Sequence, residues 1–192
     1  ISGMGALSLG NHVPVTTDAS YCVVRNCNIS NVTGNVGVIA FNISGGFNTI
    51  ESCLIKNVTS TSSFAAGMSI STGAVNTGSN VVRDCVIQNI TGGAGNVQAY
   101  QSGGFSTTTN NNIFVNCVAE SVSTTGATNS TPAYGFSIQS TNEQLFNCVA
   151  NSINAPSNIN DVRGFNIIAA NVACYNCVAN AINLGGSINN IT

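Results

Sequence analysis

Charged side chains are scarce in this chain of 192 residues. Lys, Arg, Asp and Glu together make up 5% of it, whereas they make up roughly 25% of typical soluble domains. With only 4 Lys and Arg, the chain cannot neutralise a phosphate backbone, which excludes charge-driven nucleic-acid binding. The same scarcity removes the Glu, Lys and Arg residues that stabilise long amphipathic helices, so a helix bundle is excluded as well.

Other absences narrow the fold further. No apolar run approaches the roughly 18 residues that a membrane span needs. Val, Ile, Leu and Phe are plentiful and the net charge is only -2, so intrinsic disorder is not expected. The chain starts at Ile1 without an initiator Met or a signal peptide, which predicts a mature product or the ordered part of a longer chain. A β-rich domain with a neutral surface of Asn, Ser, Thr and Gly remains.

A repeat of about thirty residues runs through the chain, and a cysteine marks each copy. The repeated cysteines are Cys27, Cys53, Cys85, Cys117, Cys148 and Cys177. Three residues before them stand the apolar or thiol side chains of Val24, Ile50, Val82, Phe114, Leu145 and Cys174. Two residues after them stand Ile29, Ile55, Ile87, Ala119, Ala150 and Ala179, and five after them Val32, Val58, Ile90, Val122, Ile153 and Ile182. This agreement indicates one structural unit used repeatedly.

A second block recurs between the cysteines and alternates apolar with polar residues, which is the period of a β-strand. The blocks are Ala6–Leu9, Ala40–Ile43, Gly67–Ile70, Ala99–Ser102, Gly135–Ile138 and Gly164–Ile167. We expect their large side chains to point inward, at Phe41, Met68, Tyr100, Phe136 and Phe165. With two more strands around each cysteine, every repeat holds three short strands. Parallel copies stacked about 4.8 Å apart would place like residues in columns, as in a three-sided solenoid.

The residue before each repeated cysteine suits a tight left-handed bend. This column reads Asn26, Ser52, Asp84, Asn116, Asn147 and Asn176, and Asn side chains there can bond to the next coil. Over residues 5 to 183 the chain resembles the pectin-lyase-like superfamily, whose right-handed parallel β-helices carry inward aliphatic, aromatic and Cys stacks and an Asn ladder. The resemblance implies an all-β, right-handed parallel β-helix with about six rungs. We expect one domain, 1–192, with rungs near 5–36, 37–62, 63–94, 95–130, 131–159 and 160–192.

The acidic residues do not form a predicted catalytic pair. Carbohydrate hydrolysis needs clustered carboxylates, and the six acids, Asp18, Glu51, Asp84, Glu120, Glu143 and Asp161, never share a column on adjacent rungs. Glu51 instead lies between Arg25 and Arg83, whereas Glu143 and Asp161 fall in loops. The superfamily's polygalacturonase signatures are missing, and His12 is the only histidine. We therefore expect no enzymatic activity, cofactor or metal site.

The cysteines are expected to be free thiols that pack in the core. The six repeated ones point into the coil as small, soft apolar side chains, and stacked parallel strands rarely provide disulfide geometry. Cys174 and Cys177 have CxxC spacing, but no second pair lies near enough in sequence to complete a metal site. Cys22 could pair with Cys27 only if the bend brings the two together.

An apolar stripe is predicted on the outside of the coil. It consists of Leu54, Val86, Val115, Val118, Phe146, Val149, Tyr175 and Val178. Large apolar patches on soluble proteins mark contact surfaces, although loops of the chain at 121–133 or 151–162 could cover this one. No capping segment is recognisable at either end, and bare coil ends invite further strands. We expect a self-associating fibre, spike or surface-layer subunit, joined end to end or laterally, in an extracellular or surface-exposed location.

Other functions remain open. The outward row Asn42, Ser69, Gln101, Ser137 and Asn166 is a candidate glycan face. The aligned Thr33, Thr59 and Thr91 suggest ice binding, but their column continues irregularly with Ser and Asn. A degenerate polysaccharide lyase or hydrolase is disfavoured by the acids. Asn31, Asn57 and Asn89 lie in glycosylation sequons and in one column, for which a hydrogen-bonded turn ladder is the alternative.

Overall fold

The computed structural model describes residues 7–8, 15–17, 20–70, 79–103, 111–126, 131–156 and 161–185, and these form strands and turns without a helix. Sheet A contains β1 (Leu7–Ser8), β4 (Asn28–Gly34), β7 (Leu54–Ser60), β10 (Val86–Gly92), β13 (Val118–Thr124), β16 (Val149–Pro156) and β19 (Val178–Gly185). Sheet B contains β2 (Val15–Thr17), β5 (Val38–Ile43), β8 (Ala65–Ile70), β11 (Val97–Ser102), β14 (Ala133–Ile138) and β17 (Val162–Ile167). Sheet C contains β3 (Val23–Arg25), β6 (Thr49–Glu51), β9 (Val81–Arg83), β12 (Ile113–Val115), β15 (Gln144–Phe146) and β18 (Ala173–Tyr175).

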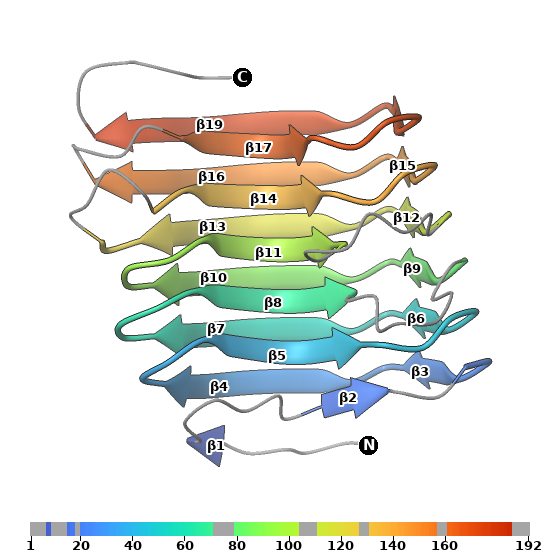
Figure 1. Ribbon diagram of the computed structural model, residues 1–192, viewed down its shortest axis with the longest axis horizontal. Helices are drawn as coiled ribbons and strands as arrows, with labels where there is room; N and C mark the ends of the chain where they lie inside the picture. The colour runs from blue at the N-terminus through green and yellow to red at the C-terminus, as the bar shows by residue number, and fades with distance from the viewer. Residues whose placement is uncertain are drawn as a thin grey trace.

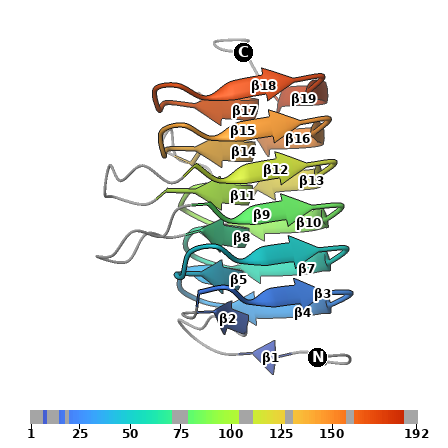
Figure 2. The ribbon, with the colours of Figure 1, turned by 90° about the vertical axis from the view of Figure 1, so that its right-hand side faces the viewer.

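The predicted parallel β-helix is confirmed. Every strand pairs in parallel with the equivalent strand of the next coil, for example β7 with β10 and β12 with β15. The chain passes from sheet B through C to A and climbs one coil each time, which is the right-handed path of Figure 1. Figure 2, turned toward sheet C, shows the same strands stacked as a ladder. The columns that the sequence predicted around the repeated cysteines are reproduced by the pairing register.

The predicted count of about six rungs needs correction. About four turns, from β5 to β16, form the solenoid proper, because each has a complete coil on both sides. Among the described residues, no further coil follows β17–β19, and only β1 lies below the coil β2–β4, beside β4. The difference is visible in one column, where Ala119 and Ala150 are fully buried but Ala179 is exposed.

The predicted strand at Ala6–Leu9 belongs to a different sheet. Leu7 pairs with Val32 in sheet A, and Val15 takes the place beside Phe41 in sheet B. The alternation of four residues cannot tell which sheet a strand joins, since both sheets offer the same two-residue period. β1 therefore gives sheet A seven strands, whereas sheets B and C have six.

The core is dry and built from columns of identical or similar side chains. The rings of Tyr100 and Phe136 stack with centroids 4.6 Å apart, and Phe136 stacks on Phe165 at 4.9 Å. The Tyr100 hydroxyl is satisfied by donating to the carbonyl of Cys85 at 2.7 Å, and burial raises its pKa well above the ordinary value. The repeated block of sheet B begins with a small residue because the space there is tight. At Gly135, for example, an added Cβ would lie 2.7 Å from the Cβ of Ala150.

The predicted left-handed bend between sheets C and A is confirmed. The six residues of its column have φ values between 51° and 54°. Asn116 donates through Nδ2 to Asp84 Oδ1 at 2.9 Å, and Asn147 donates to Asn116 Oδ1 at 3.2 Å. A second ladder lies within sheet A, where Asn57 donates to Asn31 at 2.9 Å and Asn89 to Asn57 at 3.0 Å. These Asn side chains form the hydrogen-bonded ladder that was the alternative to glycosylation.

Candidate functional site

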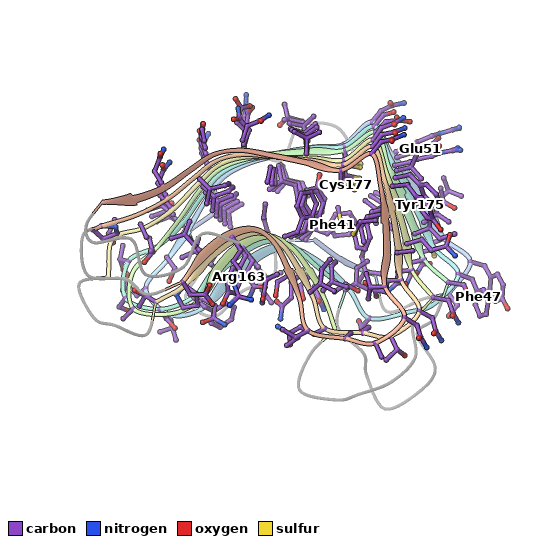
Figure 3. The ribbon with its side chains drawn as sticks, turned by 90° about the horizontal axis from the view of Figure 1, so that it is seen from above. Phe41, Phe47, Glu51, Arg163, Tyr175 and Cys177 are labelled. Atoms are coloured by element: carbon purple, nitrogen blue, oxygen red, sulfur yellow. The ribbon has the colours of Figure 1, made fainter. Side chains whose placement is uncertain are left out.

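The apolar stripe lies in two columns on either side of the left-handed bend. Its sheet C members Val115, Phe146 and Tyr175 are paired directly in register, and its sheet A members continue the adjoining column. None of the eight side chains is buried, and Tyr175 and Val178 are 53% and 45% exposed. In Figure 3, which looks along the coil, the Tyr175 side chain points away from the core.

Further apolar side chains on this face were missed by the sequence analysis, among them Val23, which is 63% exposed in the first coil. Val81 and Ile113 are paired neighbours in the other outward column of sheet C, and both are partly exposed. Their signal in the sequence is an apolar residue four positions before Cys85 and Cys117. They broaden the apolar surface from the bend across the flat face of sheet C.

The loops that were considered as a cover for the apolar stripe, 121–133 and 151–162, are partly strand. Residues 121–124 belong to β13, 133 to β14, 151–156 to β16 and 162 to β17. These strand residues build sheets A and B rather than lying over them, whereas 125–126, 131–132 and 161 lie between strands. The parts at 127–130 and 157–160 fall outside the described residues.

Charge and aromatic rings occupy opposite ends of one outward column. The column reads Arg25, Glu51, Arg83, Val115, Phe146 and Tyr175 from the first to the last coil. Arg83 donates through Nε to Glu51 Oε2 at 2.8 Å, as the predicted charge stack requires. At the other end, the rings of Phe146 and Tyr175 stack 5.0 Å apart and nearly parallel.

A second exposed aromatic pair borders the first coils on the sheet C side. The rings of Tyr21 and Phe47 stack 5.0 Å apart, and the side chains are 77% and 49% exposed. Both residues have φ near +60°, a conformation that costs most residues about 1–2 kcal/mol. In later coils Asn111, Asn142 and Asn171 adopt this conformation, and Asn tolerates it. The placement of Phe47 at this corner is visible in Figure 3.

The predicted glycan face is not an open row. Its five residues do share one column of sheet B. Ser69, Ser137 and Asn166 are buried, however, and only Asn42 and Gln101 remain partly exposed. The prediction assumed that a side chain pointing out of the core is exposed, whereas the outer face of sheet B is itself largely covered.

A polar network nevertheless exists near the C-terminal end of sheet B. Asp161 accepts hydrogen bonds from the Tyr134 hydroxyl and from Arg163 Nε, both at 2.6 Å. Arg163 also donates through Nη1 to Asn166 Oδ1 at 2.9 Å. In the column that contains Tyr134 and Arg163, the buried Gln98 has no partner for Oε1 among the described residues. Asp161 was predicted to lie in a loop, and it does so just before β17.

Glu143 lies in the loop before β15, as predicted, and it is fully buried there. It ends a ladder of buried Asn side chains in which the backbone N–H of Asn48 donates to Asn80 Oδ1 at 2.9 Å and that of Asn80 to Asn112 Oδ1 at 3.0 Å. Glu143 Oε1 accepts from Asn112 Nδ2 at 2.8 Å and from the Ser102 hydroxyl. Burial raises the pKa of Glu143 to about 7. The ladder lies five residues before the repeated cysteines, and this spacing is the sequence signal that was overlooked.

The remaining acids do not come together into a catalytic pair within the described residues. Glu120 lies beside Gln88, which in turn pairs with Lys56, and Asp84 is part of the bend ladder. Glu51 is held by Arg83. His12 and Asp18 lie outside the described residues.

All eight cysteines are free thiols, as predicted for the six repeated ones, and Cys22 does not pair with Cys27. Cys85, Cys117 and Cys148 are buried, and each Sγ lies within hydrogen-bonding distance of a backbone carbonyl two residues earlier, at 3.3 to 3.5 Å. Interaction with the Cys148 thiol and burial raise the pKa of Cys117 well above its ordinary value. Cys174 packs as the last member of the column above Leu145, but the end coil leaves it exposed. The described residues contain no group of three or more His, Cys, Asp and Glu arranged to hold a metal ion.

Comparisons with known proteins give no match to this chain. No protein-family model matches it, and no curated protein or solved structure is significantly similar to it. Within the described residues there is no helix that is long and apolar enough to span a membrane. Function must therefore be argued from the surfaces themselves.

Proposed function

We propose that this protein is a non-catalytic structural β-helix that associates with copies of itself through the apolar stripe. The observation that carries the proposal is the alignment of the stripe. Val115, Phe146 and Tyr175 stand in register on successive strands, beside a parallel column of aliphatic side chains. Covering an apolar and uncharged surface of this kind with another surface removes it from water, which is favourable.

Lateral association is favoured over end-to-end stacking. The apolar stripe runs along the side of the coil, so a copy that covers it lies beside the first copy rather than above or below it.

Val178→Ser tests the proposal, with Val36→Ser as its matched control. Both side chains are about half exposed, at 45% and 49%, but Val36 lies in the turn between β4 and β5, away from the apolar stripe. We expect Val178→Ser to weaken self-association about fivefold, equivalent to about 1 kcal/mol of apolar burial, and Val36→Ser to leave it unchanged. Light scattering coupled to gel filtration measures the oligomer, and electron microscopy shows its form. A chain that stays monomeric at high concentration overturns the proposal.

Membership of the pectin-lyase-like superfamily, in a non-catalytic branch, belongs to the same proposal. It is supported by the Asn ladder at the bend between sheets C and A and by the inward Cys column. An extracellular or cell-surface location would suit a self-associating subunit with a neutral surface.

Glycan binding is the second candidate function, and the Tyr134, Asp161 and Arg163 network favours it. Tyr134 is buried and holds Asp161 in place through its hydroxyl, so the Asp161–Arg163 ion pair supplies the directed polar groups that a sugar would meet. Arg163 and Asp161 keep about 30% and 28% of their side-chain surface exposed. We expect Arg163→Gln to abolish binding on a glycan array while Arg25→Gln preserves it. An array on which the unaltered chain binds nothing would eliminate this candidate.

A further inference from the structure

The outward column of sheet C is divided into a cationic half and an aromatic half. Arg25, Glu51 and Arg83 occupy the first three coils, and Val115, Phe146 and Tyr175 occupy the last three. Glu51 is neutralised by Arg83, which leaves Arg25, exposed on the surface, as the uncompensated charge of the column. The column therefore has a direction along the coil axis.

We propose that two copies pack face to face through sheet C with their coil axes antiparallel. This inference rests on the proposed function and specifies its partner, a second copy of this chain, with the sheet C column of the apolar stripe at the centre of the interface and the sheet A column, across the bend, at its rim. A two-fold axis running along the strands, between β9 and β12, brings Arg25 of each copy opposite Tyr175 of the other. By the same symmetry Glu51 faces Phe146, and Arg83 faces Val115. The interface is isologous and closes as a dimer.

Charge complementarity selects this orientation. A guanidinium over an exposed aromatic ring is attracted by the negative face of the ring, and Arg provides most such contacts. With parallel axes, the two cationic halves would instead meet each other and the two uncompensated Arg25 charges would share one end of the interface. The antiparallel arrangement separates these charges by the length of the column and gives each one an aromatic partner.

The geometry of the face permits the arrangement. Sheet C consists of three-residue strands in continuous parallel register, so both faces repeat at the same interval of about 4.8 Å. Coil therefore matches coil along the entire column. The exposed Tyr21 and Phe47 rings border the cationic half, and they extend the surface that the second copy would cover.

Photo-crosslinking from the middle of the column distinguishes the arrangements. Phe146 is replaced in the full chain by p-benzoylphenylalanine, and crosslinked dimers are mapped by mass spectrometry. We expect the crosslinks to reach β6, around Glu51 of the second copy. Crosslinks to β15 of the second copy indicate parallel axes and overturn this inference alone. Dimers that form without crosslinks at this position, as in end-to-end stacking, also overturn it, and a monomeric chain overturns the proposed function as well.

A residue swap provides an independent test. Tyr175→Arg brings a second guanidinium opposite Arg25 at both contacts of the dimer, and we expect this like-charge pairing to weaken dimerisation about tenfold. Adding Arg25→Tyr to the same chain re-forms both contacts with the residues exchanged, and should restore most of the affinity. Because both positions are exposed in the single chain, each variant should fold normally, which circular dichroism checks. A swap variant as weak as Tyr175→Arg overturns the inference.

Discussion

At the residue scale, Glu143 places a carboxyl group in a column that consists of buried Asn side chains in the preceding coils. Its three predecessors are Asn48, Asn80 and Asn112, whose amides are neutral and can both donate and accept. A carboxylate in the same place can only accept, and Oε2 has no partner among the described residues. The ionised form is thus disfavoured by burial, which is why the pKa rises.

The stability of the fold should therefore depend on pH through Glu143. With a pKa of about 7 in the folded chain, against the ordinary value of 4.5, the folded state holds the proton more tightly. The free energy of unfolding falls as the pH rises from about 4.5 to about 7, by about 3 kcal/mol, and is level above that. We expect Glu143→Gln to abolish this fall and to be more stable than the unaltered chain at pH 8, as measured by urea unfolding at pH 5 and pH 8. Glu120→Gln, on the outer surface, is the control and should retain the fall.

At the scale of the strand and the bend, left-handed backbone positions define the corners of the coil. The bend between sheets C and A repeats with φ values within a few degrees in all six coils. Asn fills it in four coils and tolerates the conformation, and in the last three coils the Asn side chain bonds to its neighbour above or below. Ser52 and Asp84 occupy the other two, and Asp84 still accepts the hydrogen bond of Asn116. The residues at the bend thus turn the chain from sheet C into sheet A and also link neighbouring coils through their side chains.

Asn116→Ala should destabilise the chain by about 2 kcal/mol. The substitution removes two ladder hydrogen bonds, each contributing about 0.5–1 kcal/mol at an exposed site. It also places a Cβ with no hydrogen-bonding group at a φ of 51°, which costs about 1 kcal/mol. Asn116→Gly loses the ladder but accepts the backbone conformation, so thermal unfolding should place it between Asn116→Ala and the unaltered chain. Equal stability of the two variants would show that strain plays no part.

At the scale of the whole molecule, each coil is buried by the coils stacked on either side of it. Each core column lines up similar side chains, so the burial of Cys117, Ala119 and Val122 in one coil is completed by the coils on either side. This dependence is strongest at the ends, where Cys174 and Ala179 occupy core columns and are still exposed. Outside the core, the same stacking aligns the apolar stripe into a continuous surface.

The sequence alone determined the strands, the parallel stacking and the inward columns, because a repeat marks all of them at fixed distances from each cysteine. It also located the left-handed bend, since Asn before Cys is a local signal. Tertiary structure alone decided which sheet received Leu7, how far the outer face of sheet B is covered, and that Glu143 is buried. These properties depend on what lies against a residue from another coil or another sheet. The alternation within a single strand separates inside from outside, but it carries no information about a neighbour on the outer side.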